Sequence, residues 1–443
     1  MGSEPARFCG LWRNSYVALE RKVNDEFKGL QRAIFVLSLF LTAAAIVVVN
    51  VLLYSPSIRQ DWLDEDNLLF GITPHKTINN RRILDPASIN GVYFGASIDW
   101  KAKDVPVAFN QRFGKPLPFV MCFTNMTAAN GLALVRELKY IADTVLRVDG
   151  AILGLTVMPV DPLDQMSDAV YDQLGRVCAE INRYGIPVML RFAHEMNGNW
   201  FSYGQAPGAY RASFIKAASA VKKYTNLTSM VWAPNSPIGY PWLAAGGGPA
   251  VGSADFLAMD TNQDGKLDHH DDPYTPYYPG DDYVDWIGFS VFHFGENLTA
   301  NTVPGPDDFR TAIQHVAGNE TGAPTWDIYD QFAHARNKPF AVMETGAAYY
   351  PNDVRLDDPS EMEVKRAWWK QVYSTDTLKR FPLMKLISWF DIAEDEQVNR
   401  GEKGSSFYYR DFRISWNHNI TTQFLADLPP RVFFENARES ALL

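Results

Sequence analysis

The sequence has few cysteines and no excess of basic charge. Its 443 residues include three cysteines, Cys9, Cys122 and Cys178, which are too few for a disulfide framework. Cys122 lies in an apolar run and Cys178 in a helical pattern, so we expect both to be small buried side chains, and the sequence leaves open a bond between them. The net charge of −10 disfavours nucleic acid as a partner, because a phosphate-binding face needs a basic excess.

Several signatures of chemistry are also absent from the sequence. It contains no phosphate-binding glycine loop, no catalytic metal triad and no motif for a nucleophilic serine or cysteine. We therefore expect no cofactor for catalysis. The hydrophobic content of 47% and charged content of 21% are ordinary for a globular protein, and the length allows one or two domains.

Residues 33–54 carry no charge and predict a membrane span. This apolar run would cover about 30 Å of hydrocarbon as a helix. A cleaved signal peptide is the alternative, but the run is too long, a long tail precedes it, and no cleavage site follows. The sequence therefore favours a retained signal anchor with a cytoplasmic tail at 1–32 and a stalk at 55–90.

The charges that flank the span predict its direction. Six basic residues precede it, whereas acidic residues dominate the stretch that follows, so the positive-inside rule places the N-terminus in the cytoplasm. The chain is thus predicted to be a type II membrane protein with a luminal or extracellular domain. The tail could bind the membrane surface or a membrane partner, or be a solvated segment. Five glycosylation sequons lie beyond the span, at Asn125, Asn226, Asn297, Asn319 and Asn419.

The rest of the chain alternates apolar runs with helical patterns. The runs lie at 92–98, 116–124, 150–158, 186–195, 227–235, 284–292, 339–347 and 383–391. The helical patterns lie at 129–147, 164–184, 207–223, 307–316, 325–336 and 359–379. Near-continuous apolar runs are typical of strands buried on both faces. The sequence therefore predicts an α/β fold, a (β/α)8 TIM barrel over 91–430, with a C-terminal tail at 431–443.

Two glutamates stand at the ends of these runs, where a barrel builds its active site. Glu195 ends the fourth run and Glu344 lies near the end of the seventh. A single buried glutamate could be an ion-pair partner of Arg191 or His194 at the barrel rim. Two of them at the catalytic end favour the carboxyl pair of glycoside hydrolysis, in which one group is protonated and the other ionised.

Several segments resemble glycoside hydrolase family 26, a family of retaining (β/α)8 enzymes. They are RFAHEMNGNWFSYG (191–204), MVWAPN (230–235), DYVDWIGFSVF (282–292), VMETGA (342–347) and ISWFD (387–391). The resemblance implies Glu195 as general acid/base and Glu344 as nucleophile. It also implies that His194 precedes the acid/base, that Trp200 forms a sugar platform and that Trp389 lines the cleft floor. Arg191 and Phe292 complete the predicted substrate-binding residues.

Phe292 departs from the family pattern. Many members of the family have a tyrosine near the end of strand six, and this tyrosine donates a hydrogen bond to the nucleophile. Here the aligned residue is Phe292, followed by His293. A lost hydrogen bond would weaken the positioning of the carboxylate. Either another donor replaces it, or activity is reduced, or the alignment is shifted by one residue.

The segment DTNQDGKLDHHD (260–271) fits a twelve-residue calcium loop. Its predicted ligands are Asp260, Asn262, Asp264, Lys266 through its carbonyl group, Asp268 and Asp271. The last position is Asp instead of the usual Glu, and no flanking helix pair is evident, so the sequence favours a structural Ca²⁺ ion over a calcium sensor. A solvated acidic loop is the alternative. We expect His269 and His270 only to flank this loop, because adjacent residues are poorly placed for joint ligation.

The leading interpretation is a membrane-anchored retaining endo-β-glycanase that hydrolyses a cell-wall or matrix polysaccharide. The resemblance implies β-1,4-mannan first, with mixed-linkage β-1,3-1,4-glucan or β-1,3-xylan as alternatives. A second interpretation is a catalytically weak or inactive carbohydrate-binding or scaffold subunit of a membrane polysaccharide synthase, which only Phe292 favours. A third is a barrel enzyme of unrelated chemistry, since this fold hosts many activities.

Overall fold

The computed structural model describes residues 90–132, 138, 140–142, 151–243, 247–296, 300–316, 324–399 and 405–434. The predicted tail, span and stalk, apart from Asn90, lie outside these ranges, as do the sequons at Asn297 and Asn319. Within the described ranges, no helix has the length and apolar character that a membrane crossing requires.

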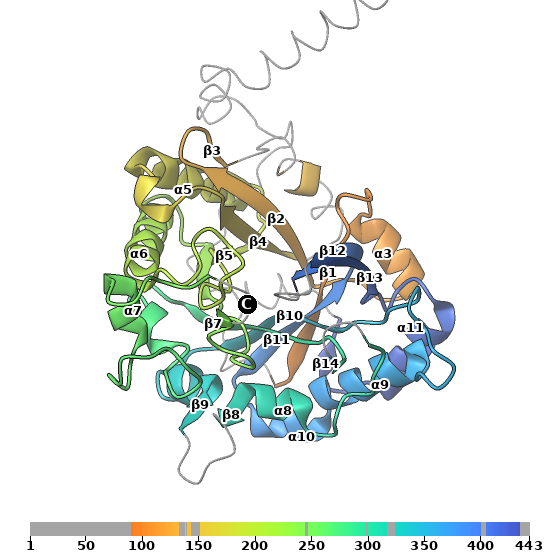
Figure 1. Cartoon of the computed structure of the whole chain (residues 1–443). Coiled ribbons are helices and arrows are strands. Elements are labelled where there is room, and N and C mark those ends of the chain that lie inside the picture. Colours follow the sequence, from red (N-terminus) through yellow and green to blue (C-terminus); the bar gives the residue numbers. More distant parts are fainter. Residues whose placement is uncertain are drawn as a thin grey trace, which may run out of the picture. The chain divides into compact units, whose positions relative to one another are not determined.

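Eight parallel strands close into a barrel (Figure 1). They are β1 (Val92–Ile98), β2 (Phe119–Thr127), β4 (Ile152–Pro159), β5 (Val188–Phe192), β6 (Thr228–Trp232), β7 (Trp286–His293), β10 (Phe340–Ala347) and β11 (Met384–Asp391). Each strand pairs with the next in this order, and β1 pairs with both β2 and β11, which closes the ring. The structure therefore confirms the predicted (β/α)8 barrel, and each predicted run contains its strand or overlaps most of it.

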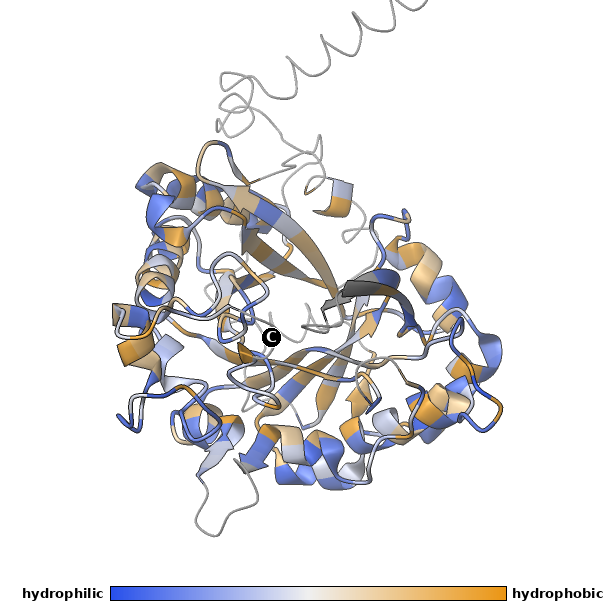
Figure 2. Ribbon diagram, in the orientation of Figure 1, coloured by the Kyte–Doolittle hydropathy of each residue, from blue (hydrophilic) through white to orange (hydrophobic). Residues whose placement is uncertain are grey.

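The helices form the outer layer of the barrel (Figure 1). They are α3 (Pro106–Phe113), α5 (Asp168–Arg183), α6 (Pro207–Tyr224), α7 (Ala254–Met259), α8 (Asp308–Ile313), α9 (Glu361–Val372), α10 (Thr375–Arg380) and α11 (His418–Asp427), with short 3-10 turns at Leu163–Gln165 and Thr275–Tyr277. Figure 2 shows the apolar strands inside this partly polar ring, as expected for strands buried on both faces.

Several predicted boundaries of helices, and the predicted end of the barrel, differ from the structure. The segment 129–147, predicted to be a helix, contains β3 (Gly131–Leu132), which pairs with β2. Most of the rest of this segment lies outside the described ranges. The patterns at 307–316 and 325–336 include a small hairpin of β8 (Gln314–Val316) and β9 (Thr325–Asp327), followed by a π-helix at Tyr329–His334. The barrel does not end at 430, because β14 (Val432–Phe433) pairs with β1.

The lower part of the barrel is filled by Phe119. A Cβ atom added at Gly154 would lie 2.2 Å from the ring of Phe119, and one added at Gly95 would lie 2.6 Å from it. Both glycines therefore leave room for the ring inside the barrel. The surrounding core cluster includes Met121 and Met189, and the free thiols of Cys122 and Cys178 are buried. The two cysteines are therefore small core residues and are not bonded to each other.

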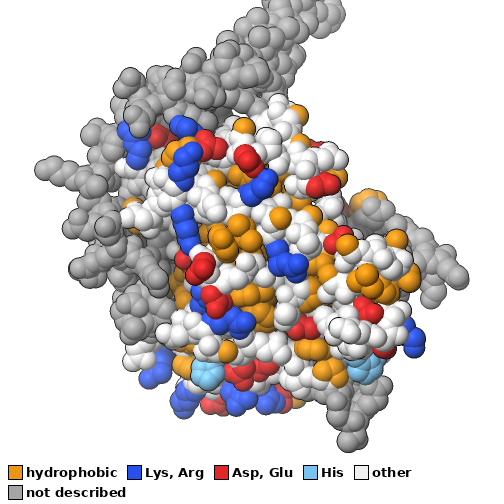
Figure 3. Space-filling view, turned by 90° about the vertical axis from the view of Figure 1, so that its left-hand side faces the viewer, with side chains coloured by type: hydrophobic (Ala, Val, Ile, Leu, Met, Phe, Trp, Pro, Cys, Tyr) orange, Lys and Arg blue, Asp and Glu red, His pale blue; other side chains and the backbone are white. Residues whose placement is uncertain are grey.

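The outer face of α5 and α6 is polar. Lys216 pairs with Asp168 at 2.8 Å, and Lys223 pairs with Asp172 at 2.7 Å. Figure 3 shows this face, on which basic and acidic side chains are interspersed and no continuous basic patch forms. Exposed ion pairs of this kind contribute little to stability, so the barrel depends on its apolar core.

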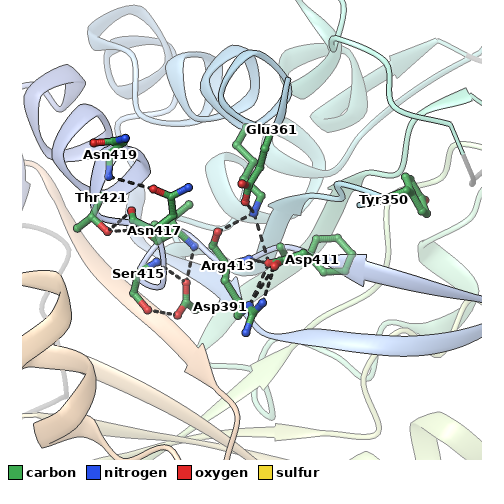
Figure 4. A network of polar contacts seen from close by, with 12 residues as sticks. Tyr350, Glu361, Asp391, Asp411, Arg413, Ser415, Asn417, Asn419 and Thr421 are labelled. Atoms are coloured by element: carbon green, nitrogen blue, oxygen red, sulfur yellow. Dashed lines mark hydrogen bonds and ion pairs between the residues drawn. The ribbon is translucent and has the colours of Figure 1, made fainter. Parts of the chain in front are cut away.

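A hairpin follows the last barrel strand and is fastened to the helices by a polar network. It consists of β12 (Ala393–Asn399) and β13 (Ser405–Asp411). Figure 4 shows the network at its base. The ammonium group of Lys365, which is fully buried, donates to Glu361 at 2.6 Å, to Asp411 at 3.4 Å and to the carbonyl group of Arg413 at 2.7 Å. Lys365 on α9 therefore fixes the end of β13.

We expect Lys365→Ala to lower the free energy of unfolding by about 1–3 kcal/mol, because it removes the hydrogen bonds of a buried ammonium group, although Asp411 keeps its ion pair with Arg413. Lys370→Ala, at an exposed position of the same helix, is the matched control and should change stability by less than about 0.5 kcal/mol. Urea unfolding measures both variants. Equal stability of the two would contradict this role of Lys365.

Candidate active site

A strained turn after β5 presents Glu195 at the mouth of the barrel. Strand β5 ends at Phe192, earlier than predicted, and Ala193 and Glu195 adopt positive φ angles of 47° and 55°. Such angles cost non-glycine residues free energy, and the surrounding structure must hold them. Two hydrogen bonds do so: the Ala193 amide donates to Val157 at 2.9 Å, and the Glu195 amide donates to Ala233 at 2.8 Å. Glu195 is thereby fixed between the ends of β4 and β6.

Arg191 links the two predicted catalytic residues. Its guanidinium group is fully buried, donates to the carboxylate of Glu344 on β10 and to the hydroxyl group of Ser290 on β7, and lies 3.7 Å from Glu195. A buried guanidinium group with these bonds holds the carboxyl groups in position. That Arg191 binds substrate stays a prediction.

The carboxyl groups of Glu195 and Glu344 are close enough to act on one sugar. Ligand atoms of His194, Glu195 and Glu344 all lie within 4.8 Å of one another. Retaining glycosidases hold their carboxyl groups about 5–5.5 Å apart, whereas inverting enzymes need about 6.5–9.5 Å to admit a water molecule. An approach within 4.8 Å lies below the inverting range and therefore favours a retaining arrangement.

The environment of Glu195 differs from that of an ordinary surface glutamate. Burial, followed by the charge of Glu344, raises its pKa to about 7, although Arg191 opposes this shift. The indole of Trp200 donates a hydrogen bond to the carboxyl group of Glu195 at 2.9 Å. Glu195 can therefore be protonated near neutral pH, as a general acid must be.

Trp200 is the exposed aromatic side chain of the site. It is 42% exposed and lies edge-on to Trp242, with ring centroids 5.0 Å apart. A Cβ atom added at Gly198 would lie 2.3 Å from the Trp200 ring, so only glycine leaves room for this orientation. The position beside Glu195 fits the predicted sugar platform.

His194 lies beside Glu195 and is nearly buried. Burial, followed by the charge of Arg191, lowers its pKa well below the ordinary value, so the ring is neutral near pH 7. Its Nδ1 atom lies 3.4 Å from the hydroxyl group of Tyr203, and its ring contacts Phe201 at 4.8 Å between centroids. These contacts hold His194 next to the carboxyl pair, where it could meet a substrate.

Trp389 and Phe292, two aromatic residues predicted to bind substrate, both pack against other aromatic side chains. Trp389 is fully buried, its indole donates to the carbonyl group of Phe412 at 2.8 Å, and its ring packs on Phe424 of α11. The prediction that it lines the cleft floor is wrong, because this position of β11 faces the helices. Phe292 is half-buried and contacts Phe390 and Phe412, with centroids 5.7 Å and 5.5 Å away.

Sequence reasoning missed Ser290 and Asn197. Ser290 accepts a hydrogen bond from Arg191, and Asn197 exchanges two hydrogen bonds with the backbone of Asn235, at 3.0 Å and 2.9 Å. Ser290 could have been found as a polar residue within an apolar strand next to the position of Phe292. The buried role of Asn197 gives no such signal, because asparagine is common in loops.

The predicted calcium loop closes on its own backbone. Asp260 accepts from the amides of Asp264 and Gly265, at 3.1 Å and 3.0 Å, and Asp271 accepts from those of Thr261 and Asp268, at 2.7 Å and 3.0 Å. Within the described ranges, no three of the loop's aspartates converge within 4.8 Å.

Within this loop, ligand atoms of Asp268, His269 and His270 do converge within that distance. The expectation that the two histidines only flank the ligands of the loop stays a prediction. Their side chains turn toward the same aspartate although they are adjacent in sequence, and His270 Nδ1 lies 3.0 Å from Asp268.

Three predicted glycosylation sites fall within the described residues. Asn125, Asn226 and Asn419 are all exposed, on β2, before β6 and on α11, respectively. Exposure is what an attached glycan requires. These positions therefore remain available for the predicted modification.

The comparisons with known proteins agree with this site. The model of glycosyl hydrolase family 26 matches residues 159–240, a segment that contains Arg191, Glu195 and Trp200. The match confirms the predicted resemblance to this family, and the chain is therefore a glycoside hydrolase.

Solved structures that resemble the chain include GH26C from Muricauda sp., with 13% identity, a TM-score of 0.49, and coverage of 78% of this chain and 87% of that one. Another is an endo-β-1,4-mannanase double mutant from Cellulomonas fimi, with 14% identity, a TM-score of 0.45, and coverage of 78% and 72%. Likenesses of this size say nothing about activity. No curated protein matches the chain.

We expect Glu344→Gln to lower the pKa of Glu195 from about 7, because the substitution removes the neighbouring negative charge. Burial persists in this variant and keeps the pKa above the ordinary value for glutamate. Carbon-13 NMR titration of labelled glutamate measures the shift, with Glu180→Gln on α5 as the control. A pKa that stays unchanged in Glu344→Gln would show that the two carboxyl groups do not interact.

Proposed function

We propose that the chain is a retaining endo-β-glycanase in which Glu195 is the general acid/base and Glu344 the nucleophile. The observation that carries this proposal is the close approach of the two carboxyl groups, within 4.8 Å at the catalytic end of the barrel. Their different surroundings support the division of roles, since Glu195 has a raised pKa and Glu344 is paired with Arg191. A carboxylate that is held by a cation suits the nucleophile, which must be ionised.

The proposed reaction proceeds in two steps. Glu195 donates its proton to the glycosidic oxygen while Glu344 attacks the anomeric carbon, which breaks the glycosidic bond and forms a glycosyl ester. The ester removes the negative charge of Glu344, so the pKa of Glu195 falls and its carboxylate can accept a proton. Glu195 then takes a proton from water, whose oxygen attacks the anomeric carbon and releases Glu344, with net retention.

The proposed substrate is a β-linked polysaccharide. β-1,4-Mannan is the first choice from the family resemblance, and mixed-linkage β-1,3-1,4-glucan and β-1,3-xylan are the alternatives. We further propose that residues 33–54 anchor the chain as a type II membrane protein with its barrel on the luminal or extracellular side, where a fixed enzyme could act on cell-wall or matrix polysaccharide.

Phe292 is the observation that favours a weak or inactive scaffold subunit, since a phenylalanine cannot donate a hydrogen bond to Glu344. Arg191 argues against that alternative, because it donates a hydrogen bond to Glu344. A binding module also has no use for two carboxyl groups that repel each other at close range. Catalysis therefore remains the better proposal.

We expect Glu195→Gln and Glu344→Gln each to reduce the release of reducing ends from the polysaccharide by at least about a thousandfold, since each removes an essential group. For the unmodified chain, kcat/KM should fall as pH rises through about 7, because Glu195 loses its proton there. Glu180→Gln serves as the control. Activity near that of the unmodified chain in either active-site variant would refute the assigned roles.

We also propose that residues 260–271 bind a structural Ca²⁺ ion through side chains that now accept bonds from the backbone. A chelator should then lower the melting temperature of the chain, and Asp260→Ala should abolish this sensitivity because it removes the first ligand. Asp255→Ala, on α7 outside the loop, is the control and should keep the sensitivity. A melting temperature that does not respond to a chelator would exclude the ion.

A further inference from the structure

The hairpin β12–β13 extends the wall of the barrel mouth. It begins two residues after β11 ends, and Glu394 of β12 lies directly opposite Arg410 of β13. Directly opposed residues of an antiparallel pair point to the same face. Arg410 is nearly buried and lies over the rings of Phe294 and Tyr350, at 4.8 Å and 6.0 Å, which follow β7 and β10. The face that carries Glu394 therefore packs toward the catalytic end of the barrel.

The hairpin starts beside the loop after β1, because Ile98 at the end of β1 lies opposite Asp391 at the end of β11, two residues before β12 begins. Besides burial, the groups that act on the pKa of Glu394 are Lys101 and Asp99, in the loop after β1, together with Glu344 and Arg410. Burial and the charge of Glu344 raise this pKa, whereas Lys101 lowers it. Glu394 thus lies near the loop after β1, on the face of the hairpin that packs toward the ends of β7 and β10. Figure 1 shows the hairpin beside β1, in agreement with this position.

The carboxyl group of Glu394 is half-buried but lacks a fixed protein partner. Within the described ranges, no hydrogen bond or ion pair joins it to another side chain or to the backbone. A half-buried carboxyl group without a partner is costly unless water or a ligand satisfies it. Glu394 faces the mouth in which a polysaccharide would lie, so a sugar is the ligand that its position suits.

The balance of charge restricts the kind of sugar. Glu344, Asp99 and Glu394 place three acidic groups around this part of the mouth, against Lys101 and the packed guanidinium of Arg410. A carboxylate on the sugar would be repelled by the acidic groups. Neutral hydroxyl groups fit better, because one hydroxyl can donate to a carboxylate and accept from an ammonium group at the same time.

We propose that Glu394 and Lys101 form a subsite next to the cleavage point that binds the hydroxyl groups of a neutral sugar unit. This inference rests on the proposed function and adds a specificity-determining residue to it. The hairpin that follows the last barrel strand then supplies part of the substrate cleft, and polysaccharides rich in uronic acid are disfavoured.

The test compares Glu394→Ala and Glu394→Gln with Asp395→Ala in the full chain. Asp395 is the matched control because it is exposed on the opposite face of the same strand and loses the same charge. We expect Glu394→Ala to lower kcat/KM on the polymer that is hydrolysed by about ten- to a hundredfold, as expected for lost hydrogen bonds to a charged group. Glu394→Gln should lose less, since it keeps an acceptor, and Asp395→Ala should stay within about twofold.

Binding is measured in parallel by calorimetry. The ligands are β-1,4-mannohexaose, a mixed-linkage glucan oligosaccharide and a β-1,3-xylan oligosaccharide. Two variants are compared, Glu344→Gln alone and Glu344→Gln with Glu394→Ala, so that the ligand is not hydrolysed during the measurement. We expect the second substitution to weaken binding by about tenfold or more while leaving the melting temperature within a degree or two.

The outcomes separate this inference from the proposed function. Hydrolysis with equal kcat/KM in Glu394→Ala and the unmodified chain would overturn the subsite and leave the function standing. Absence of hydrolysis, with oligosaccharide binding that Glu394→Ala weakens, would overturn the function and uphold the subsite. Absence of both hydrolysis and binding would overturn both.

Discussion

The site depends on one buried guanidinium group placed between two carboxyl groups. Glu195 and Glu344 approach within 4.8 Å, a distance at which two negative charges oppose each other strongly in a buried site. Arg191 makes this approach tolerable, because it donates to Glu344 and lies 3.7 Å from Glu195. The barrel supplies the geometry that lets one arginine reach both, since Arg191, Ser290 and Glu344 stand on β5, β7 and β10 of a single closed ring. A shift of any of these strands would separate the charges.

The same arrangement explains why the two carboxyl groups differ. Glu344 lies within β10, where the pairing with β7 and β11 shifts register, and accepts a hydrogen bond from Arg191, whereas Glu195 lies on a strained turn just beyond β5 and accepts a hydrogen bond from Trp200. Burial together with the charge of Glu344 raises the pKa of Glu195 to about 7. Backbone strain at Ala193 and Glu195 is therefore tied to the function, as it places one carboxyl group where it can hold a proton.

The barrel and its carboxyl pair could be predicted from the sequence, because buried parallel strands leave long apolar runs and a glutamate at the end of such a run is conspicuous. The orientation of individual side chains could not. Trp389 faces the helices and Arg191 the barrel interior, since side chains alternate along a strand and an apolar run does not indicate which side a residue takes. The hairpin β12–β13 was also missed, because its polar sequence resembles a loop, and its pairing depends on contacts with Tyr350 and Lys365, which are distant in sequence.

The replacement of the expected tyrosine by Phe292 changes how the nucleophile would be held but does not remove its support. Phe292 joins an apolar cluster with Phe390 and Phe412, and its ring has no group that could donate a hydrogen bond. Arg191 then orients the carboxylate of Glu344. A second hydrogen bond, from Arg191 to Ser290, restrains the guanidinium group. Glu195 and Glu344 repel each other, and the buried ion pair of Arg191 with Glu344 adds little to stability. A scaffold protein would therefore gain stability if these residues were replaced by apolar ones. Since this chain keeps the pair, the strained turn and the arginine together, the arrangement is better explained by catalysis than by binding alone.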